Sequence, residues 1–102
     1  LHNPKIQLPQ LRENCTAVWH QYVVRCEERD RLIEYLDEKG IGTIIHYPIP
    51  PHLAEAYQYL GYTEGAFPIT EKCAKTVLSI PMYVGMTEEE QTQVIEAINA
   101  FV

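Results

Sequence analysis

The proline run near the middle of the chain limits most strongly what this sequence can fold into. Pro48, Pro50 and Pro51 cannot donate backbone hydrogen bonds, so neither a helix nor a central strand can continue through them. The β-branched segment 41–47, IGTIIHY, precedes the run and is therefore predicted to be a strand that ends in a stiff loop. The remaining elements must lie on either side of this loop.

Three further elements are predicted before the proline run. Segment 18–25, VWHQYVVR, is rich in β-branched and aromatic residues and predicts a strand that is buried on at least one side. Segment 30–39 has apolar residues at helical spacing, and Gly40 can end that helix in a left-handed conformation. Segment 6–8 can add an edge strand.

Three helices and one strand are predicted after the proline run. Segment 52–60 predicts a short helix, and apolar residues at every fourth position over 69–77 predict another of about two turns. Segment 78–83, LSIPMY, predicts a brief strand at an edge of the sheet, because it contains a proline. The final helix begins at Thr87, whose spacing to Glu90 predicts a capping box. Its apolar stripe consists of Val94, Ile95, Ile98, Phe101 and Val102.

The order of these elements predicts an α+β fold, in which a small sheet of three or four strands carries helices packed on one face. With 102 residues, of which 46% are hydrophobic and 22% charged, the chain can form one core but not two independent domains. The sequence contains no repeat, low-complexity tract or internal linker. Residues 1–102 are therefore expected to form a single domain.

Charge and cysteine content restrict the partners and the compartment. Lys and Arg number 8 against 14 Asp and Glu, for a net charge of −6 without a basic stripe, which argues against nucleic-acid binding. No apolar run approaches the roughly 18 residues that span a bilayer, so no membrane association is expected. Cys15, Cys26 and Cys73 form no CxxC pair, which favours a reduced, cytoplasmic protein. The chain opens at Leu1, and we expect it to be a piece of a longer protein.

The segment 46–52, HYPIPPH, is the candidate functional site. A residue that precedes a proline is held in an extended conformation, so Tyr47 and Ile49 lose freedom and the flanking His46 and His52 are presented in a nearly fixed geometry. Imidazole and phenol groups can hydrogen-bond sugar hydroxyls or phosphate oxygens without carrying a charge. The pattern indicates a ligand-binding loop. In the structural alternative Tyr47 packs, the prolines end a strand and His52 starts a helix.

Other groups that can carry chemistry have simpler explanations. A metal site built from His20, His46, His52 and a cysteine matches no zinc spacing. His20 lies in a predicted strand and is expected to be a hydrogen-bonded core residue, and Cys73 is expected to be a small buried apolar one. The acidic run 88–90 is explained by the start of the last helix. No catalytic, cofactor-binding or metal-binding residue is therefore assigned.

Three segments, in order, resemble a known family. They are VWHQYVVR at 18–25, RDRLIEYLDEKGIGTIIHYPIPPHLAEAYQYLG at 29–61, and FPITEKCAKTVLSIPMYVGMTEEEQTQVIEAI at 67–98. Together they resemble the C-terminal part of the DegT/StrS family of sugar aminotransferases. The resemblance covers nearly the whole chain and is strongest to members that aminate 3-keto-6-deoxyhexoses bound to a nucleoside diphosphate. HYPIPPH followed by LSIPMY is its most specific part.

The resemblance implies a larger parent enzyme with the aspartate-aminotransferase fold, fold type I, of which this chain is the small C-terminal domain. In the family, a large N-terminal domain holds pyridoxal phosphate, and an amino group passes from glutamate to a nucleotide-linked keto-deoxysugar in amino-sugar and polysaccharide biosynthesis. The resemblance also implies that the parent enzyme is a homodimer. By resemblance, His46, Tyr47 and His52 border the active site and bind the substrate.

The resemblance also implies that this chain is inactive by itself. The family's Schiff-base lysine lies upstream of the matched part, and Lys5, Lys39, Lys72 and Lys75 do not occupy that motif. Pyridoxal phosphate is therefore expected in the parent enzyme and not on this chain. The alternative is a free-standing α+β domain that senses a small ligand or binds a protein through segment 46–52, since small α+β folds host many functions.

A domain that normally packs against a larger one should expose apolar side chains where that contact is made. The expected members of such a surface are Tyr57, Tyr59, Tyr62 and Phe67. The excised-domain interpretation therefore predicts that these four aromatic rings lie at the surface of the chain.

Overall fold

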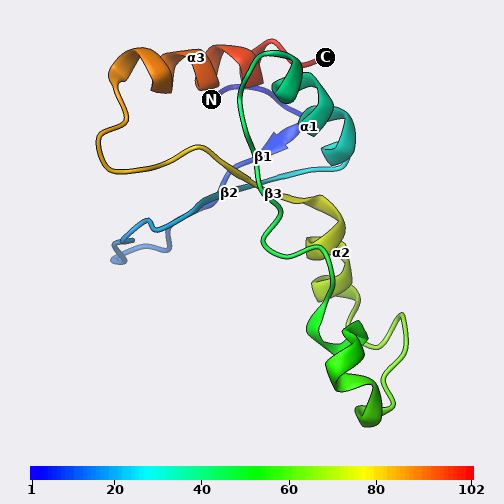
Figure 1. The fold of residues 1–102 in the computed structure, drawn as a ribbon. Helices are drawn as coiled ribbons and strands as arrows, with labels where there is room; N and C mark the ends of the chain where they lie inside the picture. Colours follow the sequence, from blue (N-terminus) through cyan, green and yellow to red (C-terminus); the bar gives the residue numbers. More distant parts are fainter.

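The computed structural model describes all residues 1–102 and is built around a three-stranded antiparallel sheet (Figure 1). The strands lie in the order β1 (Ile6–Gln7), β2 (Tyr22–Cys26) and β3 (Val77–Ile80). The expected edge strand is present as β1, which is two residues long. The sheet with its helices confirms the predicted fold class.

Two helices, α1 (Arg29–Glu38) and α3 (Glu88–Asn99), cover the same face of the sheet, as Figure 1 shows. Val24 and Leu78 are opposite each other in the register of β2 and β3, and both are fully buried beneath these helices. Because the core contains residues of both strands and both helices, its burial of apolar surface is the main force that holds the layers together.

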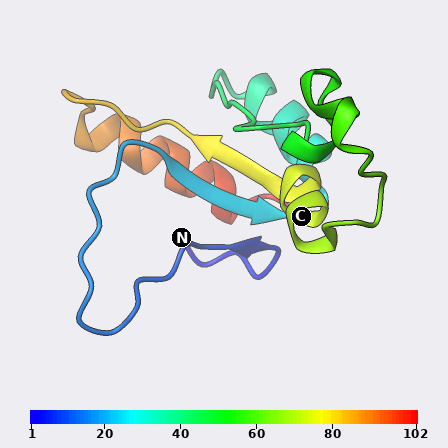
Figure 2. The same cartoon turned by 90° about the horizontal axis from the view of Figure 1, so that it is seen from below.

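The other face of the sheet carries the alternate residues of β2 and β3, which include the paired Val23 and Ser79 and also Arg25. Neither α1 nor α3 covers this face, and we call it the helix-free face. Helix α2 (Pro68–Thr76) lies beside it at one end in Figures 1 and 2. There Arg25 Nη1 lies 3.8 Å from Cys73 Sγ, and Cys73 is half-buried rather than buried as expected.

The ends of α1 and α3 follow the signals predicted from the sequence. Gly40 has φ of +72°, and its N–H donates to a carbonyl of the last turn of α1, which ends that helix as expected. Thr87 and Glu90 form the predicted capping box at the start of α3. Val102, in contrast, is 83% exposed and does not belong to the apolar stripe.

The strand predicted over 18–25 begins only at Tyr22, and this prediction is wrong for its first half. Val18 is 96% exposed, and His20 is exposed rather than a core residue. Tyr22 pairs with Ile80, the last residue of β3, and the next residue along is Pro81, which has no N–H to donate. Residues before Tyr22 therefore have no strand to pair with.

The strand predicted over 41–47 is also wrong, because the structure forms only one bridge there. Ile44 and Ser79 exchange two backbone hydrogen bonds of 3.1 and 2.8 Å at the free edge of β3. Continuing the antiparallel register would place Gly42 opposite Pro81, which cannot donate a ladder hydrogen bond. Toward the other end, the chain leaves the sheet after Ile44 and enters the proline run.

The helix predicted over 52–60 is replaced by two short 3₁₀ helices, η1 (Pro51–Leu53) and η2 (Glu55–Leu60). Ala54 lies between them with ψ of 142°, which is an extended conformation that interrupts the helix. Tyr57 and Leu60, which would lie on the apolar face of a regular helix here, are exposed. The face has no partner within this chain, so a regular amphipathic helix gains little from packing here.

Helix α2 begins and ends one residue earlier than the predicted helix over 69–77. Val77, which the four-residue spacing assigned to a helix, begins β3 directly after α2 ends. Pro68 occupies the first turn of α2, where its missing N–H costs nothing. No helix in the structure has both the length and the apolar character needed to cross a bilayer.

Replacing Leu36 by Ala should lower the free energy of unfolding by about 2–5 kcal/mol, since the side chain is fully buried and leaves a cavity. The matched control is Leu60→Ala at a 50% exposed position, which should change it by less than about 0.5 kcal/mol. Urea unfolding followed by circular dichroism measures both values. Equal losses for the two variants would contradict this description of the core.

Candidate functional site

His46 is oriented by a strand residue on the helix-free face. Its Nδ1 lies 2.9 Å from Oγ of Ser79, whose side chain is buried. The backbone N–H and C=O of Ser79 are both bonded to Ile44, so the position of the hydroxyl is fixed by the sheet edge. With Nδ1 engaged, Nε2 is the ring nitrogen that is left for a ligand.

Tyr47 follows His46 and projects from the molecule. Its side chain is 73% exposed, and its ring makes an edge contact with the ring of His46 at a centroid distance of 5.4 Å. Ile49, between the prolines, is 60% exposed. The structure therefore brings His46 and Tyr47 together. It differs from the structural alternative, in which Tyr47 would pack into the domain.

His52 has different partners from the other two predicted site residues. It is buried in η1, its Nε2 lies 2.8 Å from Oε1 of Glu71 on α2, and its ring makes an edge contact with Phe67 at 4.8 Å. For this residue the structure agrees with the alternative, in which it starts a short helical turn. His52 is thus held inside the domain and is not displayed beside Tyr47.

Glu71 is the second hydrogen-bonding centre of this region, and sequence reasoning missed it. Besides His52, its carboxylate accepts hydrogen bonds from the backbone N–H of Gly65, at 2.9 Å to each oxygen, and of Phe67, at 3.3 Å. The bonds from Gly65, followed by those from His52 and Phe67, hold the pKa of Glu71 below its ordinary value although burial opposes this. Glu71 thereby ties the loop before α2 to η1.

A cavity of about 370 Å³ lies beside His46, between the bridge at Ile44 and the segment after β3. His20, Ser79 and Tyr83 also line it, so two imidazoles, a hydroxyl and a phenol meet in one place. The hydrogen bond between Tyr83 and the Glu90 carboxylate raises the pKa of the Tyr83 phenol. Groups of this kind recognise oxygen-rich ligands by hydrogen bonding.

Neither His20 nor Tyr83 was predicted as a site residue. The alternation of segment 18–25 placed His20 inside a strand, and only the lack of a pairing partner beyond Pro81 moves it to the cavity. The motif LSIPMY, 78–83, did contain the signal for Tyr83, because a proline inside a strand pattern marks an exit from the sheet.

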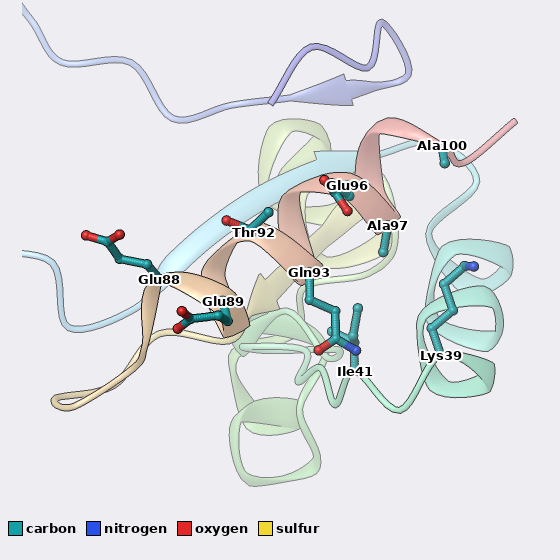
Figure 3. A pocket seen from close by; sticks show the side chains of 9 residues that line it. All are labelled: Lys39, Ile41, Glu88, Glu89, Thr92, Gln93, Glu96, Ala97 and Ala100. Atoms are coloured by element: carbon teal, nitrogen blue, oxygen red, sulfur yellow. The ribbon is translucent and has the colours of Figure 1, made fainter.

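A larger hollow lies along the outer side of α3, and Figure 3 shows its lining. It measures about 800 Å³ and extends from Glu88 and Glu89 at one end to Lys39 at the other. The two carboxylates occupy the first turn of α3, where the helix dipole stabilises them. Since its charged groups are exposed and do not converge, we place the candidate site at His46 instead.

The side chains of this chain do not fit a pyridoxal phosphate site of their own. Such a site requires a lysine that can form a Schiff base inside a pocket, with an acidic or basic partner for the ring nitrogen. All four lysines are exposed, and each lies against an acidic or aromatic side chain at the surface: Lys5, Lys39, Lys72 and Lys75. No group of three His, Cys, Asp or Glu side chains is arranged to hold a metal ion.

The fold is that of a part of solved aminotransferase structures. The chain matches the X-ray structure of DesV from S. venezuelae in complex with a ketimine intermediate, with a TM-score of 0.91 and 39% identity over 96% of this chain and 26% of that one. It also matches NtdA from Bacillus subtilis with bound cofactor PMP, with a TM-score of 0.76 and 32% identity over 93% of this chain and 22% of that one.

Residues 2–99 match the model of the DegT/DnrJ/EryC1/StrS aminotransferase family, and the chain belongs to this family. It is 42% identical over 101 residues to dTDP-3-amino-3,6-dideoxy-alpha-D-galactopyranose transaminase of Aneurinibacillus thermoaerophilus, covering 99% of this chain and 27% of that protein. It is 40% identical over 95 residues to dTDP-3-amino-3,4,6-trideoxy-alpha-D-glucose transaminase of Streptomyces venezuelae, covering 93% and 25%.

The chain spans about a quarter of the length of these curated relatives. This agrees with the prediction of a piece of a larger aminotransferase and gives no support to the free-standing alternative. The four aromatic residues expected at a covered surface are indeed exposed by 42–80%: Tyr57, Tyr59, Tyr62 and Phe67.

The contacts of Glu71 should depend on pH. Because its folded pKa is lowered, its stabilising contribution is complete above the unfolded value of about 4.5 and is lost as the pH falls through the folded value. The hydrogen-exchange protection factor of the Gly65 amide should therefore be constant from neutral pH to about 5 and fall below 4.5. The Glu71→Gln variant should lack this step. An identical step in the variant would show that another group is responsible.

Proposed function

We propose that the whole protein containing this chain is a pyridoxal-phosphate-dependent aminotransferase that transfers an amino group from glutamate to a nucleotide-linked keto-deoxysugar in amino-sugar biosynthesis. The proposal is carried by the 42% identity to a dTDP-amino-sugar transaminase over 99% of the chain, together with the close structural match to DesV. We assign residues 1–102 to its C-terminal small domain and the cofactor site to the rest of the protein.

The cofactor, when bound, supplies the electron sink that lets an amino group be removed from one carbon and added to another. In this proposal the present chain contributes substrate binding. His46 offers Nε2 to an oxygen of the nucleotide-linked sugar, and Tyr47 offers its ring and hydroxyl from the same side. His52 does not contact the substrate in this proposal, because its Nε2 is bonded to Glu71. It supports the binding residues by holding the end of the loop in place.

The exposed apolar side chains indicate where another domain or subunit can pack against this chain. Four aromatic side chains on η2 and in the loop before α2 stay 42–80% exposed: Tyr57, Tyr59, Tyr62 and Phe67. We propose that the large N-terminal domain or a second subunit packs on these side chains in a homodimeric, cytoplasmic enzyme. Burial of these rings would offset their unfavourable exposure to water.

An absorbance spectrum of the full-length protein tests the proposed activity. We expect a band near the visible edge that bleaches when glutamate is added, because the amino group of glutamate is taken up by the bound cofactor. The 102-residue chain, run alongside, should be colourless. A full-length protein without such a band would contradict the proposal. The resemblance to aminotransferases would then be one of fold alone.

Substitutions in the loop test the substrate contacts. His46→Ala and Tyr47→Ala should each raise the KM for the nucleotide-linked keto-sugar about fivefold to fiftyfold, as expected for loss of one hydrogen bond to a substrate. His52→Ala should raise it as well by loosening the loop, and Tyr47→Phe separates the hydroxyl from the ring. Steady-state kinetics of the full-length enzyme gives these values. Unchanged KM and kcat/KM across the series would rule out substrate binding by this loop.

A further inference from the structure

The two ends of segment 46–52 are attached to one continuous piece of the fold. His46 is bonded to Ser79 on β3, and His52 is bonded to Glu71 on α2. Helix α2 ends at Thr76 and β3 begins at the next residue, so there is no loop between the two attachment points. The segment therefore forms an arch whose two ends are held by the same helix–strand unit.

The attachment at His52 is buried, and the attachment at His46 joins a half-buried imidazole to the buried Ser79. Hydrogen bonds that are shielded from water in this way are stronger than surface contacts of the same kind. The side chains of His52 and Glu71 are only 7% and 9% exposed, and Ser79 is 7% exposed. No buried side-chain nitrogen or oxygen in the structure lacks a hydrogen-bond partner. Breaking either attachment would leave a buried polar group unpaired, which is costly.

The part of the arch between its ends is stiff and exposed. Pro48, Pro50 and Pro51 fix three of its backbone φ angles, while Tyr47 and Ile49 point away from the domain with exposures of 73% and 60%. Since the arch lacks glycine and is held at both ends, its exposed side chains have few alternative positions. A preformed surface of this kind binds a ligand at a small entropy cost.

We propose that Glu71 and Ser79 are positioning residues that fix Tyr47 and the free Nε2 of His46 for the nucleotide-linked sugar before it arrives. This inference rests on the proposed function, because it assigns residues that act through the same loop. The Ser79 hydroxyl can donate to or accept from Nδ1, so it sets the orientation of the ring in either tautomer. Glu71 acts by holding His52 in place. Its hydrogen bond from the N–H of Gly65 in turn fixes the Glu71 carboxylate against the loop before α2.

The test uses the full-length enzyme with four substitutions. Ser79→Ala and Glu71→Ala remove the two attachments, and Tyr47→Ala removes the positioned side chain. Glu64→Gln is the control, because Glu64 is a 73% exposed acid that pairs only with the surface Lys75. The measurements are the KM for the nucleotide-linked keto-sugar, the rate of the glutamate half-reaction and the thermal midpoint.

We expect Ser79→Ala and Glu71→Ala to raise the KM for the keto-sugar by about fivefold or more, with the glutamate half-reaction within about twofold of the starting enzyme. Glu64→Gln should change neither value. In the Tyr47→Ala background, Glu71→Ala should raise the KM by a smaller factor than in the starting enzyme, because one of the two side chains that the arch positions is already absent. Purely additive effects in this cycle would overturn the positioning role.

Two amide substitutions at His52 keep the test decisive if Glu71→Ala fails to fold. In His52→Gln the side-chain amide nitrogen can take the place of Nε2 and donate to Glu71, whereas in His52→Asn it lies too close to the backbone. The KM should rise less for Gln than for Asn. Equal effects would count against the attachment through Glu71.

The outcomes also separate this inference from the proposed function. A normal KM in both Tyr47→Ala and His46→Ala would remove the substrate contacts of the loop, and the positioning role with them, while the proposed aminotransferase activity would stand; the absence of the glutamate-sensitive cofactor band would overturn that activity. A raised KM in those variants, with an unchanged KM in Ser79→Ala and Glu71→Ala, would retain the loop as the substrate contact and overturn only the positioning role.

Discussion

The burial of Val24 and Leu78 beneath α1 and α3 is the constraint on which the rest of the structure depends. These residues are paired across β2 and β3 and are completely inaccessible to water. Because side chains alternate along a strand, fixing this pair on the helix side forces Val23 and Ser79 onto the helix-free face. A shift of one residue in either strand would exchange the two faces and destroy both the core and the candidate site.

The polar side chains of the candidate site are organised by this sheet edge. Ser79 holds Ile44 through two backbone bonds and His46 through its hydroxyl, so one residue determines where the chain leaves the sheet and how the imidazole is turned. Glu71, on the preceding helix α2, holds the imidazole of His52 by a hydrogen bond. The fold thus uses a short helix–strand unit to present an exposed, proline-stiffened loop, which is how rigid scaffolds commonly carry functional loops.

The sequence predicted the helices and the loop better than the strands and the contacts. Local signals are sufficient for the capping box at Thr87 and for the positive φ at Gly40, and both were predicted correctly. Strand limits depend on partners that are distant in sequence. Pro81 ends the pairing on both sides of β3, so His20 lies outside β2 and Ile44 forms a single bridge rather than part of a strand. The role of Glu71 was not predictable, because nothing local links it to His52 and Gly65.

Hydrogen exchange of the full-length protein with and without a nucleotide-linked keto-sugar tests most directly the claim that the helix-free face and its loop receive the substrate. Peptides covering residues 42–60 should exchange more slowly when the sugar is bound, while the exchange of α3 should be unchanged. Slower exchange along Glu88–Asn99, with residues 42–60 unaffected, would contradict substrate binding at this loop and would place the binding site in the hollow along α3 that Figure 3 shows.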